Sequence, residues 1–208
     1  MKLTISTILM IVFAVTFALT SYGEIIVLFD ENANNEAGVG NFVGLFSSHD
    51  AGSAVAIEKD AISGKVSVSC TAQQSYNNIM AGWKYPIDKT PFMTFAWKKD
   101  SGKIIMIQMA YDNNWAYRYH CGDNAAPGWP STQLDAKVPK DWTVYTRDLT
   151  KDFAKGWNLT GLALTPWDGK GYYDFILLTT TAKEAKIVGK AVEANQKVAT
   201  AWGNIKQL

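Results

Sequence analysis

Apolar and polar residues alternate in short runs along most of the chain after Glu24, with turn residues between the runs. A period of two is typical of β-strands that bury one face. The pattern predicts strands over residues 25–29, 55–57, 66–70, 79–85, 92–98, 103–111, 115–121, 142–147, 159–165 and 172–178. Because no helical segments alternate with these runs, the pattern predicts an all-β fold, an antiparallel β-sandwich, rather than a βαβ fold.

Two long segments interrupt the strands, 30–50 and 123–139, and both are rich in Gly, Asn, Asp, Ser or Pro. Such composition is typical of loops. In the strand that precedes the second loop, strict alternation predicts Trp115 on one face with the two tyrosines, and Arg118 with His120 on the other.

The first 23 residues have the pattern of a signal peptide. Lys2 supplies a positive charge near the start, and residues 5–19 are apolar apart from Thr and Ser. Ser21 and Gly23 then place small residues at the −3 and −1 positions of a cleavage site before Glu24. The alternative, an uncleaved anchor helix, requires a longer apolar stretch. The sequence therefore predicts a secreted or periplasmic protein with one binding domain over 24–180 and no membrane span in the mature chain.

The segment 181–208 differs from the rest because it is rich in Ala, Lys, Glu and Gln and its apolar residues recur at helical spacing. It predicts an amphipathic α-helical tail. This tail either packs on its own sandwich or acts as a linker or as an association helix for a protein partner.

Charge and motifs exclude several functions. The formal net charge is +1, so no basic field favours nucleic acid or an anionic membrane. The two histidines, His49 and His120, have no metal-ligand spacing, and no nucleophile elbow or phosphate-binding glycine loop occurs. We therefore expect no enzymatic activity. Cys70 and Cys121 either form a disulfide in an oxidising compartment or remain as buried thiols.

The chain is enriched in flat aromatic residues, with eight Trp and nine Tyr, which can stack on sugar rings or fill a sandwich core. Trp129 lies in a Gly- and Pro-rich loop, where burial is harder to arrange, and Trp115 and Trp167 flank turns. We predict these three as ligand contacts, with Arg118 and His120 as polar partners. The alternatives are core or rim packing for each Trp, and a solvated face or a salt bridge for the two polar residues.

Several segments, in this order, resemble the galactose-binding-like β-sandwich (jelly roll) of many carbohydrate-binding modules and of the complex I intermediate-associated proteins. These segments are Val27–Asp30, Trp142–Leu149, Asp152–Phe153, Gly161–Thr165, Asp168–Gly169 and Tyr172–Leu178. The resemblance covers 25–178 and describes a fold better than a ligand. It implies a carbohydrate or glycan ligand, and no sugar-contacting residue carries over by motif.

The resemblance also implies a structural Ca²⁺, for which Asp30 and Asp174 are the matching positions. Calcium requires several hard oxygen ligands from adjacent segments. The alternative for Asp174 is an exposed carboxylate, or one bonded to loop amides. Two functions follow for the chain: a secreted carbohydrate-binding module, or a structural protein of the cell envelope whose sandwich and tail helix assemble with other exported proteins. An enzyme on this fold is the third and least favoured reading.

Overall fold

The computed structural model describes residues 24–30, 43–44, 46, 48–73, 75–76, 83–112, 114–125 and 127–186. The predicted signal peptide and residues 187–208 of the predicted tail lie outside the described residues, so both remain predictions.

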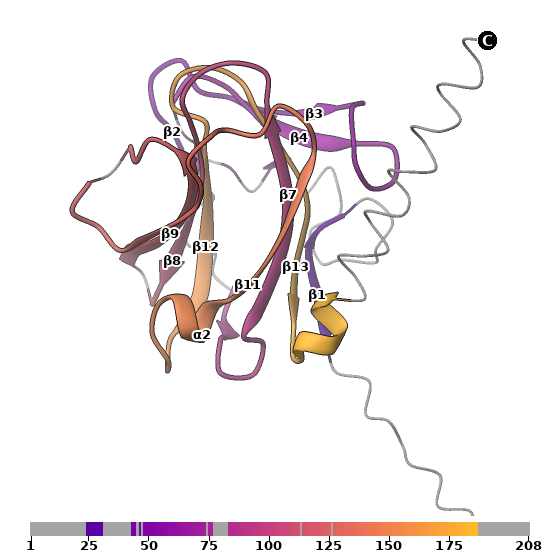
Figure 1. Ribbon diagram of the computed structural model, residues 1–208, viewed down its shortest axis with the longest axis vertical. Helices are drawn as coiled ribbons and strands as arrows, with labels where there is room; N and C mark the ends of the chain where they lie inside the picture. The colour runs from indigo at the N-terminus through magenta and orange to yellow at the C-terminus, as the bar shows by residue number, and fades with distance from the viewer. Residues whose placement is uncertain are drawn as a thin grey trace, which may run out of the picture.

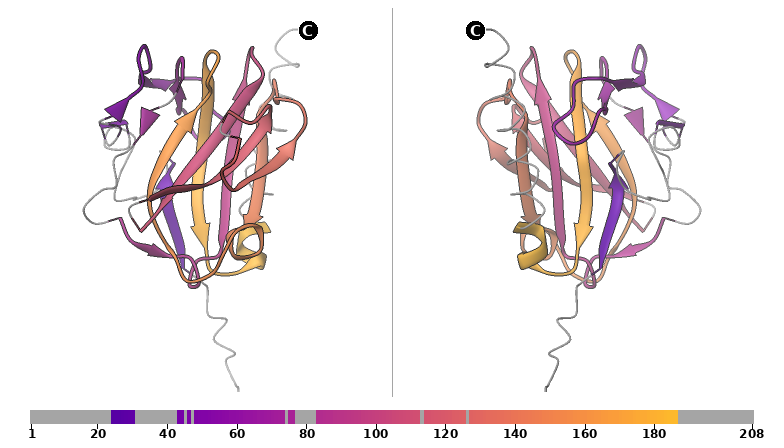
Figure 2. Two further views of the ribbon diagram at one scale, coloured as in Figure 1. Left: turned by 90° about the vertical axis from the view of Figure 1, so that its left-hand side faces the viewer. Right: turned by 90° about the vertical axis from the view of Figure 1, so that its right-hand side faces the viewer.

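The described strands form two sheets that face each other (Figures 1 and 2). The six-stranded sheet has the order β11 (Thr143–Asp148), β7 (Phe92–Lys99), β13 (Gly171–Thr179), β4 (Ser67–Cys70) and β3 (Val55–Glu58), and β1 (Ile25–Phe29) also pairs with β13. The seven-stranded sheet has the order β10 (Ser131–Asp135), β9 (Asn114–Gly122), β8 (Ile104–Tyr111), β12 (Asn158–Thr165), β5 (Ser75–Tyr76) and β2 (Ser48–His49), and β6 (Tyr85–Pro86) also pairs with β12.

The predicted β-sandwich is confirmed. Two short strands were not predicted, β2 inside the segment 30–50 that was predicted as a loop, and β5, and there are two further corrections to its strands. The first is β10, a strand inside the segment predicted as a loop, which pairs in parallel with β9 while the other pairs are antiparallel. The second concerns the predicted strand 79–85: Trp83 and Lys84 are not in a strand, Tyr85 begins β6, and 79–82 lie outside the described residues.

The core lies between the sheets and is rich in aromatic rings. Phe95 and Trp97 of β7 are fully buried, with ring centroids 4.9 Å apart. Phe95 also stacks on Tyr119 of the opposite sheet at 5.8 Å, and Trp97 meets Tyr145 edge-on at 5.5 Å. Such pairs add stabilisation beyond the area they bury, because their quadrupoles favour offset and edge-on contacts.

Neither cysteine forms a disulfide, and both are buried in this core, Cys70 in β4 and Cys121 in β9. The Cys70 thiol donates to the carbonyl oxygen of Leu164 at 3.3 Å, and Cys121 Sγ lies 3.4 Å from the Tyr145 hydroxyl. Of the two alternatives left open by the sequence, the structure therefore shows buried thiols.

A short helix, α2 (Leu149–Asp152), connects β11 to β12 and so crosses from one sheet to the other (Figure 1). Asp148 caps it by accepting hydrogen bonds from the Thr150 and Lys151 amides. Asp152 accepts from the Tyr119 hydroxyl at 2.7 Å and pairs with Arg147 at 2.6 Å. These contacts fix the connection against the core.

The chain becomes helical again over 182–186, where the described part ends. Thr181 and Glu184 form a capping box: the Thr181 hydroxyl accepts from the Glu184 amide, and the Glu184 carboxylate accepts from the Thr181 amide, each at 3.2 Å. Within the described residues, no helix is long and apolar enough to cross a membrane.

Candidate functional site

The candidate site is the side of the seven-stranded sheet that faces away from the core between the sheets, and its side chains in β8 and β12 are largely buried. In β8, alternate side chains Ile105, Ile107 and Met109 belong to the core. Met106 and Gln108 therefore point to the opposite side of the sheet. Gln108 is polar and only 7% exposed, so it requires hydrogen-bond partners on the side of the sheet that faces away from the core.

Strand pairing adds polar neighbours to this surface, because residues directly opposite in antiparallel strands share a face. Arg118 of β9 lies opposite Gln108, and His120 lies opposite Met106. From the other side, Thr165 of β12 also lies opposite Met106. The structure thus brings the two predicted polar ligands onto one face, as the alternation predicted.

Two irregularities place further residues on this surface. A register shift between β8 and β9 sets Trp115 opposite Ala110, which points outward, so Trp115 leaves the tyrosine face that strict alternation predicted for it. In β12, Leu159 and Leu162 both belong to the core, and a register shift falls between them. Thr160 therefore turns outward. We define the outer face by these residues: Met106, Gln108, Ala110, Trp115, Arg118, His120, Thr160, Gly161, Ala163 and Thr165.

A row of hydrogen bonds crosses three strands of the outer face. Gln108 Nε2 donates to the Thr165 hydroxyl at 2.9 Å, and Gln108 Oε1 accepts from Arg118 Nε at 2.8 Å. Arg118 Nη1 donates to the Ala116 carbonyl at 3.1 Å. These bonds hold the guanidinium in one orientation, and only 5% of the residue is exposed.

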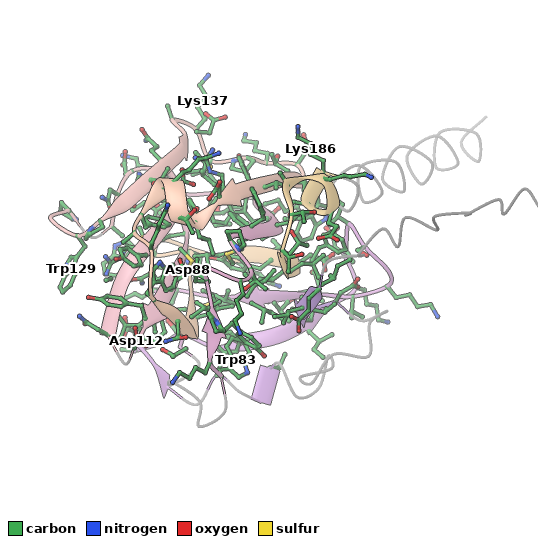
Figure 3. All side chains as sticks on the ribbon, turned by 90° about the horizontal axis from the view of Figure 1, so that it is seen from below. Trp83, Asp88, Asp112, Trp129, Lys137 and Lys186 are labelled. Carbon is green, nitrogen blue, oxygen red and sulfur yellow. The ribbon has the colours of Figure 1, made fainter. Side chains whose placement is uncertain are left out.

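Trp129 lies over this guanidinium, with the Arg118 Cζ 5.2 Å from the ring centroid. Its loop, Pro127–Pro130, is exposed throughout, and Trp129 itself is 51% exposed. Figure 3 shows it at the margin of the molecule, on the side away from Lys186. A guanidinium on one side of an aromatic ring fixes the ring and leaves its other side available for a flat ligand.

His120 lies beside this pair and is bonded to Ser131 of β10, with Nδ1 and the hydroxyl oxygen 2.6 Å apart. Burial lowers the pKa of His120, so the imidazole is neutral at pH 7. A Ser–His pair is also the beginning of a nucleophilic triad. Within the described chain, however, no carboxylate contacts His120, so the group that orients the base in such triads is missing there.

Thr160 adds an unsatisfied group to the outer face. Its Oγ1 is buried and, within the described part of the chain, has no hydrogen-bond partner. An unpaired buried hydroxyl costs roughly 1–3 kcal/mol. Because this oxygen is fully buried, the structure gives a ligand no access to it.

Trp167 is placed elsewhere. It is 40% exposed and has a left-handed backbone, with φ of 61°, in the connection between β12 and β13. Its amide donates to the Gln73 carbonyl at 3.0 Å, and the next residue, Asp168, pairs with the buried Lys99 at 2.7 Å. No described contact joins Trp167 to the outer face, so the structure brings together four of the five predicted ligand residues.

Asp174 is fully buried in β13, and its carboxylate accepts three main-chain hydrogen bonds. Oδ2 accepts from the Ile62 amide at 2.9 Å and the Ser63 amide at 3.1 Å, and Oδ1 accepts from the Phe175 amide at 2.7 Å. Asp30 lies close enough that its charge raises the pKa of Asp174.

These contacts do not fit a calcium site by themselves. Ca²⁺ takes six to eight oxygens, whereas both oxygens of Asp174 already face N–H donors. Among the described residues, no three His, Cys, Asp or Glu side chains gather around one point. Calcium at Asp30 and Asp174 stays a prediction, and the bond to loop amides accounts for the buried carboxylate without a metal.

A separate cleft of about 320 Å³ lies between the β11 edge, α2 and the beginning of the tail, and it contains none of the predicted ligand residues. It is lined by Phe92, Thr146, Arg147, Asp148, Lys151, Asp152, Ala182 and Lys186. Its acids are already paired, Asp152 with Arg147 and Asp148 with Lys151. This pairing indicates a structural role for the charges.

The fold and the site define a two-sheet β-sandwich whose outer face combines apolar residues with a few polar ones, next to an aromatic loop. No family model matches this chain, and no curated protein sequence matches it. Solved structures similar to it include a family 11 carbohydrate-binding module from Clostridium thermocellum in complex with a β-1,3-1,4-mixed-linked tetrasaccharide, with 10% identity, a TM-score of 0.43, and 76% of this chain and 96% of that chain covered.

A family 29 carbohydrate-binding module from Piromyces equi is similar over 76% of this chain and 91% of its own, with 9% identity and a TM-score of 0.39. A CBM22-1 xylan-binding domain from Paenibacillus barcinonensis is similar over 65% of this chain and 86% of its own, with 12% identity and a TM-score of 0.38. These proteins are of the class that the sequence resemblance names. At such scores we take the fold from the strand pairings and the site from its own contacts.

Proposed function

We propose that this protein is an exported, non-catalytic module that binds carbohydrate at the outer face and the Trp129 loop. The observation that carries the proposal is the half-exposed ring of Trp129, held from one side by the buried guanidinium of Arg118 at 5.2 Å. A sugar ring offers an apolar C–H face for the open side of the indole.

The polar groups of the outer face supply what the hydroxyls of such a ligand require. Gln108 and Thr165 form a bonded row with Arg118. Few polar groups on a mostly apolar floor are typical of small-ligand sites, where they fix orientation. Export is proposed from the first 23 residues of the sequence alone.

The test is binding to a panel of neutral and acidic polysaccharides, measured by affinity electrophoresis and titration calorimetry. Trp129→Ala is compared with Trp167→Ala, which removes a similarly exposed tryptophan from another loop. Loss of a central aromatic anchor typically costs 2 kcal/mol or more, about 30-fold in affinity. We expect this loss in Trp129→Ala and wild-type affinity in Trp167→Ala.

Two results would overturn the proposal. If the wild type binds no member of the panel, carbohydrate is not its ligand. If Trp167→Ala loses binding and Trp129→Ala does not, the site lies in the other loop. Thermal melts of both variants ensure that a loss of affinity is not a loss of fold.

A further inference from the structure

The surroundings of Arg118 bear on the chemistry of the ligand, an inference that rests on the proposed function. Arg118 is 5% exposed, and its described contacts are all with neutral groups. Nε donates to Gln108, Nη1 donates to the Ala116 carbonyl, and the Trp129 ring covers the guanidinium. Within the described chain, no Asp or Glu pairs with it.

The other described cations behave differently. Each remaining Lys or Arg that is buried or half-buried in the described chain pairs with a carboxylate. The pairs are Lys98–Asp60, Lys99–Asp168, Arg147–Asp152 and Lys170–Glu58. Arg118 is therefore the exception to how this fold accommodates positive charge.

An unpaired buried cation is costly, and groups kept in such a state are concentrated at functional sites. The Nη2 atom of Arg118 makes no hydrogen bond within the described chain. It is not among the fully buried side-chain atoms that lack a partner, so part of its surface is accessible. Nη2 lies on the same edge of the guanidinium as Nε, and its N–H groups are left for a ligand. The Nη1 and Nη2 atoms together present the planar fork that a carboxylate matches with two parallel hydrogen bonds.

We infer that the ligand is an acidic polysaccharide, whose uronic-acid carboxylate pairs with Arg118 while its ring packs against Trp129. The carboxylate of the ligand supplies the negative charge that no described Asp or Glu places beside this guanidinium. Because the Trp129 ring lies over Arg118, the carboxylate reaches the guanidinium past the edge of the ring.

The first experiment uses the wild-type protein and three forms of one polymer: polygalacturonate, its methyl ester and its carboxyl-reduced form. Alginate and hyaluronan test other uronates, and neutral β-glucan, xylan and galactan complete the panel. We expect binding to acidic polymers, with affinity at least about tenfold lower once the carboxylates are esterified or reduced, and falling as salt increases.

The second experiment assigns the charge. Arg118→Gln is expected to lose the preference for the acid over the ester, and Arg118→Lys is expected to keep part of it. Lys137→Gln removes the same charge from an exposed residue that lies far from Trp129 (Figure 3), and it is expected to bind as the wild type does. Circular dichroism and thermal melts establish that each variant is folded. If Arg118→Gln does not fold, the inference is tested by two other measurements. These are the affinity of the wild type for the acid compared with the ester, and the part of that preference that Arg118→Lys retains.

The outcomes separate this inference from the proposed function. Equal binding of acid and ester, or a neutral polymer as the strongest ligand through Trp129, overturns the acidic ligand and leaves carbohydrate binding standing. Acid preference that survives in Arg118→Gln also overturns it, since general charge then explains the binding. Failure of every polysaccharide overturns both.

Discussion

The buried carboxyl group of Asp174 makes the stability of this protein depend on pH. Burial raises the pKa of Asp174 from 3.8 to about 7, although its three main-chain N–H donors act in the opposite direction. The nearby charge of Asp30 raises the pKa further. The folded protein therefore holds a proton on Asp174 at a pH where the unfolded chain has released it.

The sign follows from linkage. A folded-state pKa above the unfolded-state value gives a contribution to stability that is complete below about pH 3.8 and is lost as the pH rises to about 7. The difference of about 3 between the two pKa values corresponds to about 4 kcal/mol in total. Between about pH 5 and about pH 8, the wild type should lose about 3 kcal/mol from this group.

His120 acts in the opposite direction. Burial lowers its pKa, so its contribution to stability increases as the pH rises towards the unfolded-state value of 6.5. The Asp174→Asn variant retains His120 and lacks the titrating carboxyl group. Its stability should therefore not fall between about pH 5 and about pH 8. In Asp174→Asn, the side-chain amide nitrogen faces one main-chain N–H. This contact between two donors lowers stability by an amount that does not depend on pH.

Urea unfolding, followed by tryptophan fluorescence in the presence of EDTA, measures these free energies of unfolding. Asp123→Asn, a change at an exposed aspartate, is the matched control and should keep the wild-type pH dependence. The reasoning is wrong if Asp174→Asn and the wild type lose stability in parallel over this range, or if the wild type is equally stable at both ends of it.

Three further predictions concern the scaffold. Gly122→Ala should lower the melting midpoint by roughly 5 °C or more, since Gly122 has φ of 75° and a Cβ there would lie 1.9 Å from the Lys103 carbonyl oxygen; an unchanged midpoint would contradict this. The thiols of Cys70 and Cys121 should react with a disulfide reagent only after unfolding, because both are buried, and fast reaction of the native protein would count against the packing. Calcium at Asp174 predicts a midpoint that falls in EDTA and recovers with Ca²⁺, and no shift counts against the metal.

The sequence was informative wherever a largely apolar run is bounded by turn residues, even though these strands are buried on both faces. β7, β8, β9, β12 and β13 lie within one or two residues of their predicted bounds. β10 was missed because Leu134 is the only apolar residue in Ser131–Asp135, and none of its five residues is buried. A strand at the edge of a sheet can be held by main-chain pairing, which leaves little mark on the pattern of side chains.

The candidate site was only partly predictable for related reasons. The common face of Arg118 and His120 followed from alternation, but that of Trp115 depended on a register shift that alternation does not reveal. Gln108 carried a signal that was not used, as the only strongly polar residue between Ile104 and Ala110. Trp167 lies apart from the outer face because of long-range contacts such as its hydrogen bond to Gln73. A local sequence pattern does not reveal such contacts.

The parallel pairing of β10 with β9 also explains why a long connection precedes Ser131. Ser131 lies beside Arg118, so after Gly122 the chain must return past four residues, about 13 Å, before β10 can begin. A tight turn cannot make that return. Shortening the connection would therefore detach the edge strand, whereas exchanging its side chains would not. The fold therefore sets the length of this segment.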